Sequence, residues 1–480
     1  MLRFLVRWLA PLAVVYGVCV AALFWLIPLP PRATLAEVDR HELQAVFAQG
    51  TKALVTCMEL ETRGQTETIL DLASGARQGF YRHYPIGWES EVAERKLPAG
   101  ACERCDFVAG REDGGRFVYA RKRDETYELV WFDGPELKEA GRLVTPEWDD
   151  AAFRQVDPTC RFAAIFGPRR EASGETKWAL SLWSLDRGKA IILRAKLDTP
   201  TVFATFSPDG RRLAVLAASG ESFVHCWDTA SGELLLKQPY TFNRETRIAL
   251  GFSGDGTQLG IASISWSGNG GGSEAVSELY DLEAKRRVAR TELGEASWLV
   301  GNGQATESMY VVSAKEDELI ARKAFGDAPE QKLRLTLEKA GGMRLPRDLS
   351  TVEGRGLTNA AGWIMMGEKG NLPTAEWKKW INEHWPLEKP PFPVEERTKL
   401  GFYRWGAREP ALALVGYVPL EVPVSPGFFV TEEERGPLHL FAFPPPRPWG
   451  AIFGWPALLP GVVVLVLAWR YWLGRPALQQ

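Results

Sequence analysis

The stretch TVFATFSPDGRRLAVLAASGESFVHCWDTASGELLLKQPY, from Thr201 to Tyr240, decides the fold. Its apolar runs predict four short strands, at residues 201–207, 212–218, 222–228 and 234–238. Pro208-Asp209-Gly210 forms a tight turn between the first two, because Pro fixes φ and Gly readily adopts positive φ. Short strands separated by Gly, Asp and Ser turns at this spacing predict an antiparallel sheet. A sheet of four strands and about 40 residues is the repeating unit, or blade, of a β-propeller.

The same scheme recurs on both sides of this stretch. Downstream, Phe252-Ser253-Gly254-Asp255-Gly256 takes the position of the first turn, with Asp255 in the place of Asp209. An aspartate recurs near the end of each predicted third strand, at Asp71, Asp133, Asp186, Asp228 and Asp281. Strand-rich stretches with weaker marks follow at about 296–325, 333–368 and 398–443, and GFYRWGA and PLHLFAF are predicted as strands of one last blade. These repeats predict an all-β fold, a β-propeller of seven or eight four-stranded blades over residues 32–447, and about seven is the favoured count.

The unit at 201–240 resembles a WD40 repeat of a divergent, bacterial type. The matching residues are the turn Phe206–Gly210 and the pair Trp227-Asp228 before Thr229-Ala230-Ser231-Gly232, although the usual Gly-His before the first strand is missing. The resemblance is specific over about 160–290 and is extrapolated over the rest of the propeller. WD40-like proteins generally act as platforms for protein assembly, so the resemblance implies a protein-binding scaffold.

Two long apolar runs lie at the ends of the chain. No charged residue occurs from Trp8 to Pro31 or from Trp449 to Trp469. A helix of about 20 apolar residues crosses the hydrocarbon layer of a bilayer, so residues 1–31 are predicted as a transmembrane anchor and residues 448–480 as a second transmembrane helix with a short basic tail. The alternatives are a cleaved secretory signal for the first run and a buried helix of a soluble core for the second.

The charges beside these runs predict their orientation. Arg3 and Arg7 precede the first run, Arg470 and Arg475 follow the second, and neither tail contains an acidic residue. Positively charged tails stay in the cytoplasm. We therefore expect a protein of the cytoplasmic membrane, anchored in lipid by two spans, with both termini cytoplasmic and the propeller extracytoplasmic.

An insertion interrupts the β repeats at about 374–393. In TAEWKKWINEHW, from Thr374 to Trp385, helical spacing places Trp377, Trp380 and Ile381 on one face, and a Pro-rich stretch follows. This helix is interpreted either as an element that docks a partner or the membrane surface, or as a helix packed on its own propeller. With the Gly-rich loop Gly268–Ser273, which has strands on both sides and is predicted as a plain hairpin connection, it forms the candidate binding surface.

The cysteines leave several interpretations open. Cys102-Glu103-Arg104-Cys105 has C-x-x-C spacing, but neither a βαβ context nor a second C-x-x-C accompanies it. In an exported chain the two thiols are predicted to form a small disulfide loop, and the alternatives are inert thiols or a redox or metal function. Cys160 and Cys226 fall in strand patterns and are predicted to be small core residues.

Composition argues against several classes of function. The formal net charge of −3 excludes a general electrostatic grip on nucleic acid, and the five His are scattered. No catalytic motif, cofactor site or metal site is predicted, and the chain is expected not to be an enzyme. The alternative is an exported propeller enzyme, a hydrolase or a quinone-dependent dehydrogenase, with its site in the central funnel. We expect unidentified protein partners and no nucleic acid.

Overall fold

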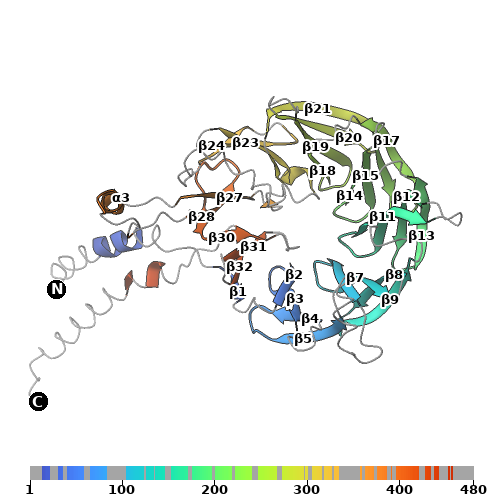
Figure 1. The fold of residues 1–480 in the computed structure, drawn as a ribbon, viewed down its shortest axis with the longest axis horizontal. Coiled ribbons are helices and arrows are strands. Elements are labelled where there is room, and N and C mark those ends of the chain that lie inside the picture. The colour runs from blue at the N-terminus through green and yellow to red at the C-terminus, as the bar shows by residue number, and fades with distance from the viewer. Residues whose placement is uncertain are drawn as a thin grey trace, which may run out of the picture. The chain divides into compact units, whose positions relative to one another are not determined.

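Eight antiparallel sheets of four strands each make up the fold of residues 33–442 (Figure 1). The structure is a computed structural model, and it describes residues 13–21, 31–35, 41–58, 65–83, 104–123, 126–134, 136–145, 153–170, 176–196, 201–218, 222–240, 247–266, 273–296, 298–300, 305–315, 318–326, 329–334, 357–358, 363–371, 376–385, 391, 396–420, 427–433, 437–442, 452–454 and 456–457. The fold is therefore an all-β propeller, and each sheet is one blade.

Seven blades follow one another along the chain, each as a four-stranded meander. Blade 1 consists of β2 (His41–Phe47), β3 (Lys52–Met58), β4 (Gln65–Asp71) and β5 (Arg77–His83). Blade 2 consists of β6 (Arg104–Gly110), β7 (Arg116–Arg123), β8 (Thr126–Asp133) and β9 (Lys138–Val144). Blade 3 consists of β10 (Phe153–Val156), β11 (Phe162–Arg170), β12 (Thr176–Ser184) and β13 (Lys189–Lys196). Blades 4 and 5 are β14 (Thr201–Phe206), β15 (Arg212–Ala218), β16 (Ser222–Asp228) and β17 (Leu234–Tyr240); and β18 (Arg247–Phe252), β19 (Gln258–Trp266), β20 (Ser273–Asp281) and β21 (Arg286–Glu295). Blade 6 consists of β22 (Trp298–Val300), β23 (Tyr310–Lys315), β24 (Glu318–Lys323) and β25 (Gln331–Arg334), and a 3-10 turn, Thr306–Ser308, precedes β23. Blade 7 consists of β26 (Leu357–Thr358), β27 (Trp363–Asn371), β28 (Glu396–Arg404) and β29 (Leu412–Val415).

The eighth blade contains both ends of the propeller. Its strands are β30 (Tyr417–Pro419), β31 (Phe428–Glu433), β32 (Leu438–Ala442) and β1 (Ala33–Leu35), in which Ala33 pairs with Leu440. Buried residues of blade 8, including Val430 and Leu440, pack against Leu43 and Val46 of blade 1, so blade 8 joins the first blade to the seventh.

The prediction of seven blades was wrong, because the eighth blade has no contiguous repeat. GFYRWGA lies in β28 of blade 7 and at the turn that follows it, whereas PLHLFAF contains β32 of blade 8. The fourth strand of blade 8 comes from the other end of the chain. A count of repeats along the sequence therefore merges two blades into one.

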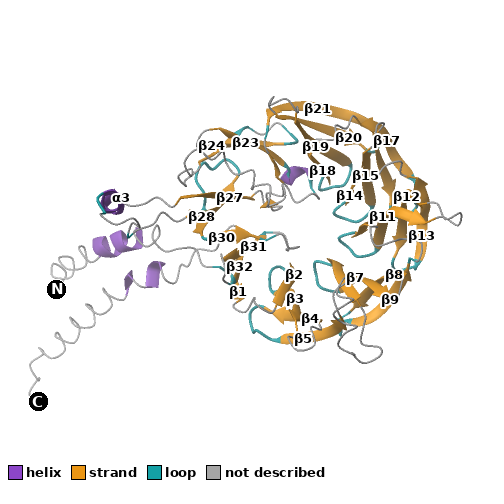
Figure 2. Cartoon of the chain, in the orientation of Figure 1, coloured by secondary structure: helices purple, strands orange, loops and turns teal. Residues whose placement is uncertain are grey.

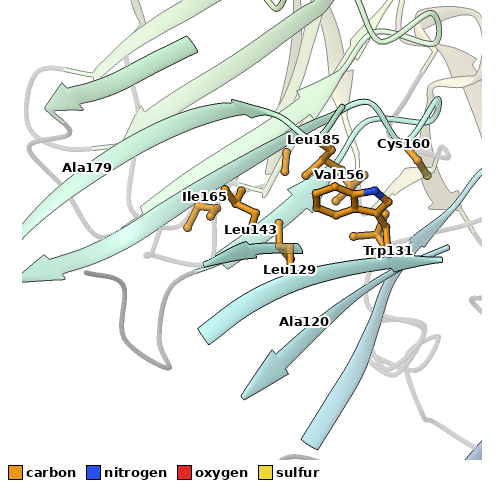
Figure 3. Packing of buried hydrophobic residues seen from close by; sticks show 11 residues of the cluster. Ala120, Leu129, Trp131, Leu143, Val156, Cys160, Ile165, Ala179 and Leu185 are labelled. Atoms are coloured by element: carbon orange, nitrogen blue, oxygen red, sulfur yellow. The ribbon is translucent and has the colours of Figure 1, made fainter. Parts of the chain in front are cut away.

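Each blade is buried on both faces by its neighbours. In β15, Leu213, Ala214, Val215 and Leu216 are all completely buried. A sheet covered on both sides needs apolar residues at consecutive positions, and this explains why the strands lack strict apolar and polar alternation. The apolar side chains gather in clusters between consecutive blades, such as Leu129 and Leu143 of blade 2 against Ile165 of blade 3 (Figure 3).

The fourth strands form the outer rim of the propeller, where β17 and β21 lie in Figure 2. β21 is exposed along nearly its whole length and carries Arg286, Arg287 and Arg290. Charged side chains on an edge strand prevent it from pairing with a strand of another molecule. The first strands lie at the opposite side of each sheet, toward the propeller axis.

The insertion in blade 7 contains the predicted helix, α3 (Glu376–Glu383), between β27 and β28. The prediction of a helix in this segment is therefore confirmed.

The terminal segments, residues 1–32 and 441–480, form a second compact unit, separate from the propeller unit of residues 33–440. Helical turns are described at 13–21, 452–454 and 456–457, and most of the two predicted spans, 8–31 and 449–469, lies outside the described residues. Within the part of the chain that the structure describes, no helix is long and apolar enough to cross a membrane.

Candidate functional site

The strand order gives the propeller two different faces. In an antiparallel meander, the first-to-second and third-to-fourth connections lie at one end of the sheet, and we name this side the turn face. Backbone hydrogen bonds confirm that the two connections meet, since the amide of Thr229 donates to the carbonyl of Arg211 (2.9 Å) and the amide of Leu185 to that of Arg161 (2.8 Å). The second-to-third and fourth-to-first connections lie on the opposite side, the loop face.

The same tight turn joins the first two strands in blades 2 to 5. Its left-handed position is occupied by Gly114, Gly210 and Gly256, with φ between 70° and 72°. In blade 3 this position is Cys160, with φ 54°. The prediction that Cys160 lies in a strand was therefore wrong: it is a buried turn residue, and burial raises the pKa of its thiol to about 12. Cys226 lies in β16 and is buried, as predicted.

Aspartates stabilise these turns by accepting hydrogen bonds within them. Asp209 accepts from the hydroxyl of Ser207 (2.6 Å) and the amide of Arg211 (3.0 Å). Asp255 accepts from Ser253 and Thr257, and these bonds lower its pKa to about 2. Both predicted residues are thus engaged by their own turn.

Asp157, in the corresponding turn of blade 3, was missed by the sequence prediction. Its carboxylate is fully buried and accepts from the amides of Thr159 (2.9 Å), Arg161 (2.7 Å) and Phe162 (2.6 Å). Burial raises the pKa of this carboxyl although the hydrogen bonds oppose it. The turn sequence here is Asp157-Pro158-Thr159-Cys160, which lacks the Gly that marks the other turns. The Asp-Pro pair was the available signal.

The third-strand aspartates cap the next turn. Asp71 accepts from the amide and hydroxyl of Ser74 (2.8 and 2.7 Å), and Asp228 accepts from the same groups of Ser231 (both 2.8 Å). The hydrogen bond from the backbone amide of Ser74 is the main reason that the pKa of Asp71 is lowered. Asp281 accepts from the amides of Glu283 and Ala284. These residues lie where the sequence predicts, at the ends of β4, β16 and β20.

Asp133 and Asp186 instead hold two blades together through one arginine. Arg116 of blade 2 binds both carboxylate oxygens of Asp133 (2.6 Å each), and its Nη1 contacts Asp186 (2.7 Å) and donates to the carbonyl of Cys160 in blade 3 (2.9 Å). The Arg116 side chain is only 13% exposed. A two-oxygen guanidinium pair fixes geometry as well as charge.

The turn face therefore uses its polar groups for its own structure. Neighbouring blades also bond directly, as from the amide of Ala48 to the carbonyl of Glu112 (2.8 Å) and from the amide of Gly254 to Glu307 (3.0 Å). Over the described residues, no group of three or more His, Cys, Asp or Glu side chains is arranged to hold a metal ion. The aspartates that recur in the sequence thus bind groups of their own turns or Arg116.

Trp227, the other predicted blade residue, is buried in the core between blades 3 and 4. The ring of His225 stacks on it, with centroids 5.3 Å apart. Burial lowers the pKa of His225 to about 4. This pair is a packing feature of the blade.

Cys105 lies in a polar cluster between blades 1 and 2. Its Sγ is 2.8 Å from the hydroxyl of Tyr81, and nearby Glu67 accepts from Thr56 (2.9 Å) and Tyr119 (3.2 Å). Cys105 and Tyr119 are buried, and burial raises the pKa of Tyr119 well above its usual value. Cys102 lies outside the described residues, so the predicted disulfide stays a prediction.

The loop face carries the three longest connections between the described strands, residues 84–103, 335–356 and 372–395. The last of these contains α3. The Gly-rich connection between β19 and β20 is also a second-to-third connection, so the topology brings both predicted parts of the binding surface to this face. Most of Gly268–Ser273 lies outside the described residues.

Helix α3 has an inverted pattern of exposure. Trp377 is 56% and Trp380 is 60% exposed, whereas Lys378, Lys379 and Asn382 are partly buried. His384 stacks on Trp380, with centroids 4.6 Å apart. A surface helix normally turns its apolar stripe toward the core. The tryptophan face of α3 is thus not buried on its own propeller.

No protein-family model and no curated protein sequence matches the chain. Among solved structures it is similar to TolB from Acinetobacter baumannii, at 14% identity over 54% of this chain and 56% of that one, with a TM-score of 0.29. It is also similar to the β-propeller domain of the Trilobed protease from Pyrococcus furiosus (10% identity, 64% and 85% covered, TM-score 0.35) and to an oligogalacturonate lyase in complex with manganese (12% identity, 71% and 93% covered, TM-score 0.39). The chain spans little more than half the length of TolB. We infer nothing about activity or partners from these likenesses.

Proposed function

We propose that this chain is a binding platform, an eight-bladed propeller that presents its loop face to a protein partner. One observation carries the proposal: α3 exposes Trp377 and Trp380, and Trp385, two residues after the end of the helix, is 40% exposed. Among the propeller residues whose side chains the structure describes, no other Trp, Tyr or Phe is exposed. Large exposed apolar side chains grouped together are typical of interaction sites, and Trp is enriched among the residues that dominate binding energy.

The spacing of these residues suggests how the partner binds. Trp377 and Trp380, which are exposed, the partly buried Ile381, and His384 directly after the helix follow the i, i+3, i+4, i+7 pattern of a helix that lays one face into a groove. The partner is then a protein with an apolar groove that accepts a short helix. The divergent WD40-like character of blades 3 to 5 agrees with a scaffold, and among the described residues the turn face exposes no comparable group of aromatic side chains.

The proposal includes membrane anchoring. The apolar segments 8–31 and 449–469 each have the length and composition of a span, and the arginines beside them favour cytoplasmic termini. The platform then lies on the extracytoplasmic side of the cytoplasmic membrane.

Crosslinking in intact cells tests the binding site. The full chain carries a tag on its C-terminal tail, and captured proteins are compared between wild type, the double variant Trp377→Ala/Trp380→Ala and the control Lys378→Ala/Lys379→Ala on the other side of α3. We expect a reproducible partner set that the tryptophan variant loses at least tenfold and the lysine variant keeps. Equal capture by all three proteins would overturn the proposed site.

A further inference from the structure

The two ends of the propeller unit lie side by side in one sheet. Ala33 of β1 pairs with Leu440 of β32 in antiparallel register. Adjacent strands are about 4.8 Å apart, so the chain enters and leaves the propeller at nearly the same point. The apolar segments on either side, 8–31 and 449–469, are therefore attached to neighbouring strands.

Each terminal segment has one covered and one exposed face where it is described. In the helix at 13–21, Tyr16, Cys19 and Val20 are partly buried, whereas Val14 and Val18 are 65% and 64% exposed. Positions 16, 19 and 20 share one helix face. In the C-terminal segment, Ile452 and Pro456 are buried and Phe453, Gly454 and Ala457 are exposed. Such a helix is apolar on every side, but only one of its faces is covered. This arrangement is expected of a helix that pairs with another helix in lipid.

A hydrogen bond joins the two segments. The hydroxyl of Tyr16 donates to the carbonyl oxygen of Phe453, 3.3 Å away. Tyr16 carries the only hydroxyl between Trp8 and Pro31. Pro456 has no amide hydrogen to complete the helical bond to Ile452, and its ring opens the helix at this turn. The carbonyl that Pro456 releases is that of Ile452, next to the Phe453 carbonyl that accepts from Tyr16, and polar side chains of a neighbouring helix satisfy backbone groups at such a turn in a membrane.

From these observations we propose that the two apolar segments bind each other as a pair of helices, through the face of Tyr16, Cys19 and Val20 and the turn around Phe453. The pairing rests on the membrane anchoring proposed above and specifies it: the anchor is one two-helix unit. Helices packed in this way have axes about 8–10 Å apart.

Thiol crosslinking of the full chain in cell membranes tests the pairing. The native Cys19 is combined with Ile452→Cys, at the covered position beside Phe453, and treated with a bismaleimide whose reach matches a spacing of about 8–10 Å. The matched control moves the first thiol to the exposed face, as Cys19→Ser/Val18→Cys/Ile452→Cys. The linked peptides are quantified by mass spectrometry, and a sample of each membrane is extracted with alkaline carbonate.

We expect the Cys19 pair to give at least fivefold more linked peptide than the Val18 pair, in a protein that resists extraction. Equal yields from the two pairs would overturn the pairing, and resistance to extraction would then leave the anchoring intact. Release of the chain by carbonate would overturn the anchoring instead. The extraction and the crosslinking yield are separate readouts, so the two failures can be told apart.

Discussion

The two faces of the propeller use polar and aromatic side chains in opposite ways. On the turn face, the recurring aspartates and Arg116 bind backbone amides and each other, within and between blades. On the loop face, α3 exposes its tryptophans and partly covers its lysines. The comparison teaches that recurrence in this sequence marks structure, whereas the feature that occurs once, the helical insertion, marks the proposed site.

The largest expected effect is on the turn face at Asp157. Asp157→Ala removes the acceptor of three backbone amides in a fully buried turn. Because buried donors are left without acceptors, we expect a loss of about 3 kcal/mol in the free energy of unfolding. Chemical denaturation of the purified full chain measures it. Asp209→Ala, in the partly exposed turn of blade 4, is the control, and an equal loss in both variants would contradict the assigned difference.

Arg116 provides the next effect. Arg116→Met removes the bonds to Asp133, Asp186 and the carbonyl of Cys160, and we expect a loss of about 2 kcal/mol, because several bonds to a largely buried charge disappear together. Arg111→Met is the matched control, since Arg111 is 41% exposed and pairs with Asp113 inside one turn. Exposed pairs contribute about 0.5 kcal/mol. A similar denaturation midpoint for both variants would show that Arg116 does not stabilise the contact between the two blades.

Acid should weaken the turn face. The folded-state pKa values of Asp71 and Asp255 lie below the unfolded value of 3.8. The folded state therefore favours the ionised form, and this contribution is present above pH 4 and is lost as the pH falls toward about 2. Thermal melts between pH 5 and pH 2.5 should show a smaller decrease for Asp71→Asn/Asp255→Asn than for wild type. Identical decreases would show that these carboxylates do not contribute.

The smallest effect on stability is expected on the loop face. Trp377→Ala/Trp380→Ala removes side chains that are already more than half exposed. Little apolar surface returns to water on unfolding, so we expect a change within about 0.5 kcal/mol. Denaturation of this variant beside wild type checks the value. A loss above 2 kcal/mol would mean that the tryptophans pack on the propeller and do not form an exposed binding face.

The sequence predicted the fold best where local turn chemistry repeats. In blade 4, the predicted second and third strands match β15 and β16 at every residue, and the recurring aspartates lie in or beside the predicted turns. The eighth blade was missed because its strands β1 and β32 are neighbours in space but lie at opposite ends of the propeller sequence. No local pattern in the sequence records that contact. The turn at Cys160 was missed because its left-handed position lacks the Gly that marks the other turns, and the Asp157-Pro158 pair was its one signal.

The candidate surface was located in part. Helical spacing identified α3 and its tryptophan face, but spacing alone leaves open whether that face is buried or exposed. The exposure depends on where α3 lies relative to blade 7, a tertiary property. That the Gly-rich connection and α3 belong to one face follows from strand order, which requires the complete set of sheets.

The most direct test of the account measures both faces in one set of preparations. Wild type, Arg116→Met and Trp377→Ala/Trp380→Ala are each assayed for denaturation midpoint and for the yield of crosslinked partner per folded molecule. We predict that Arg116→Met lowers the midpoint and keeps the yield, whereas the tryptophan variant keeps the midpoint and loses the yield at least tenfold. A lower midpoint in the tryptophan variant, or unchanged partner capture by that variant, would contradict the division between a structural turn face and a binding loop face.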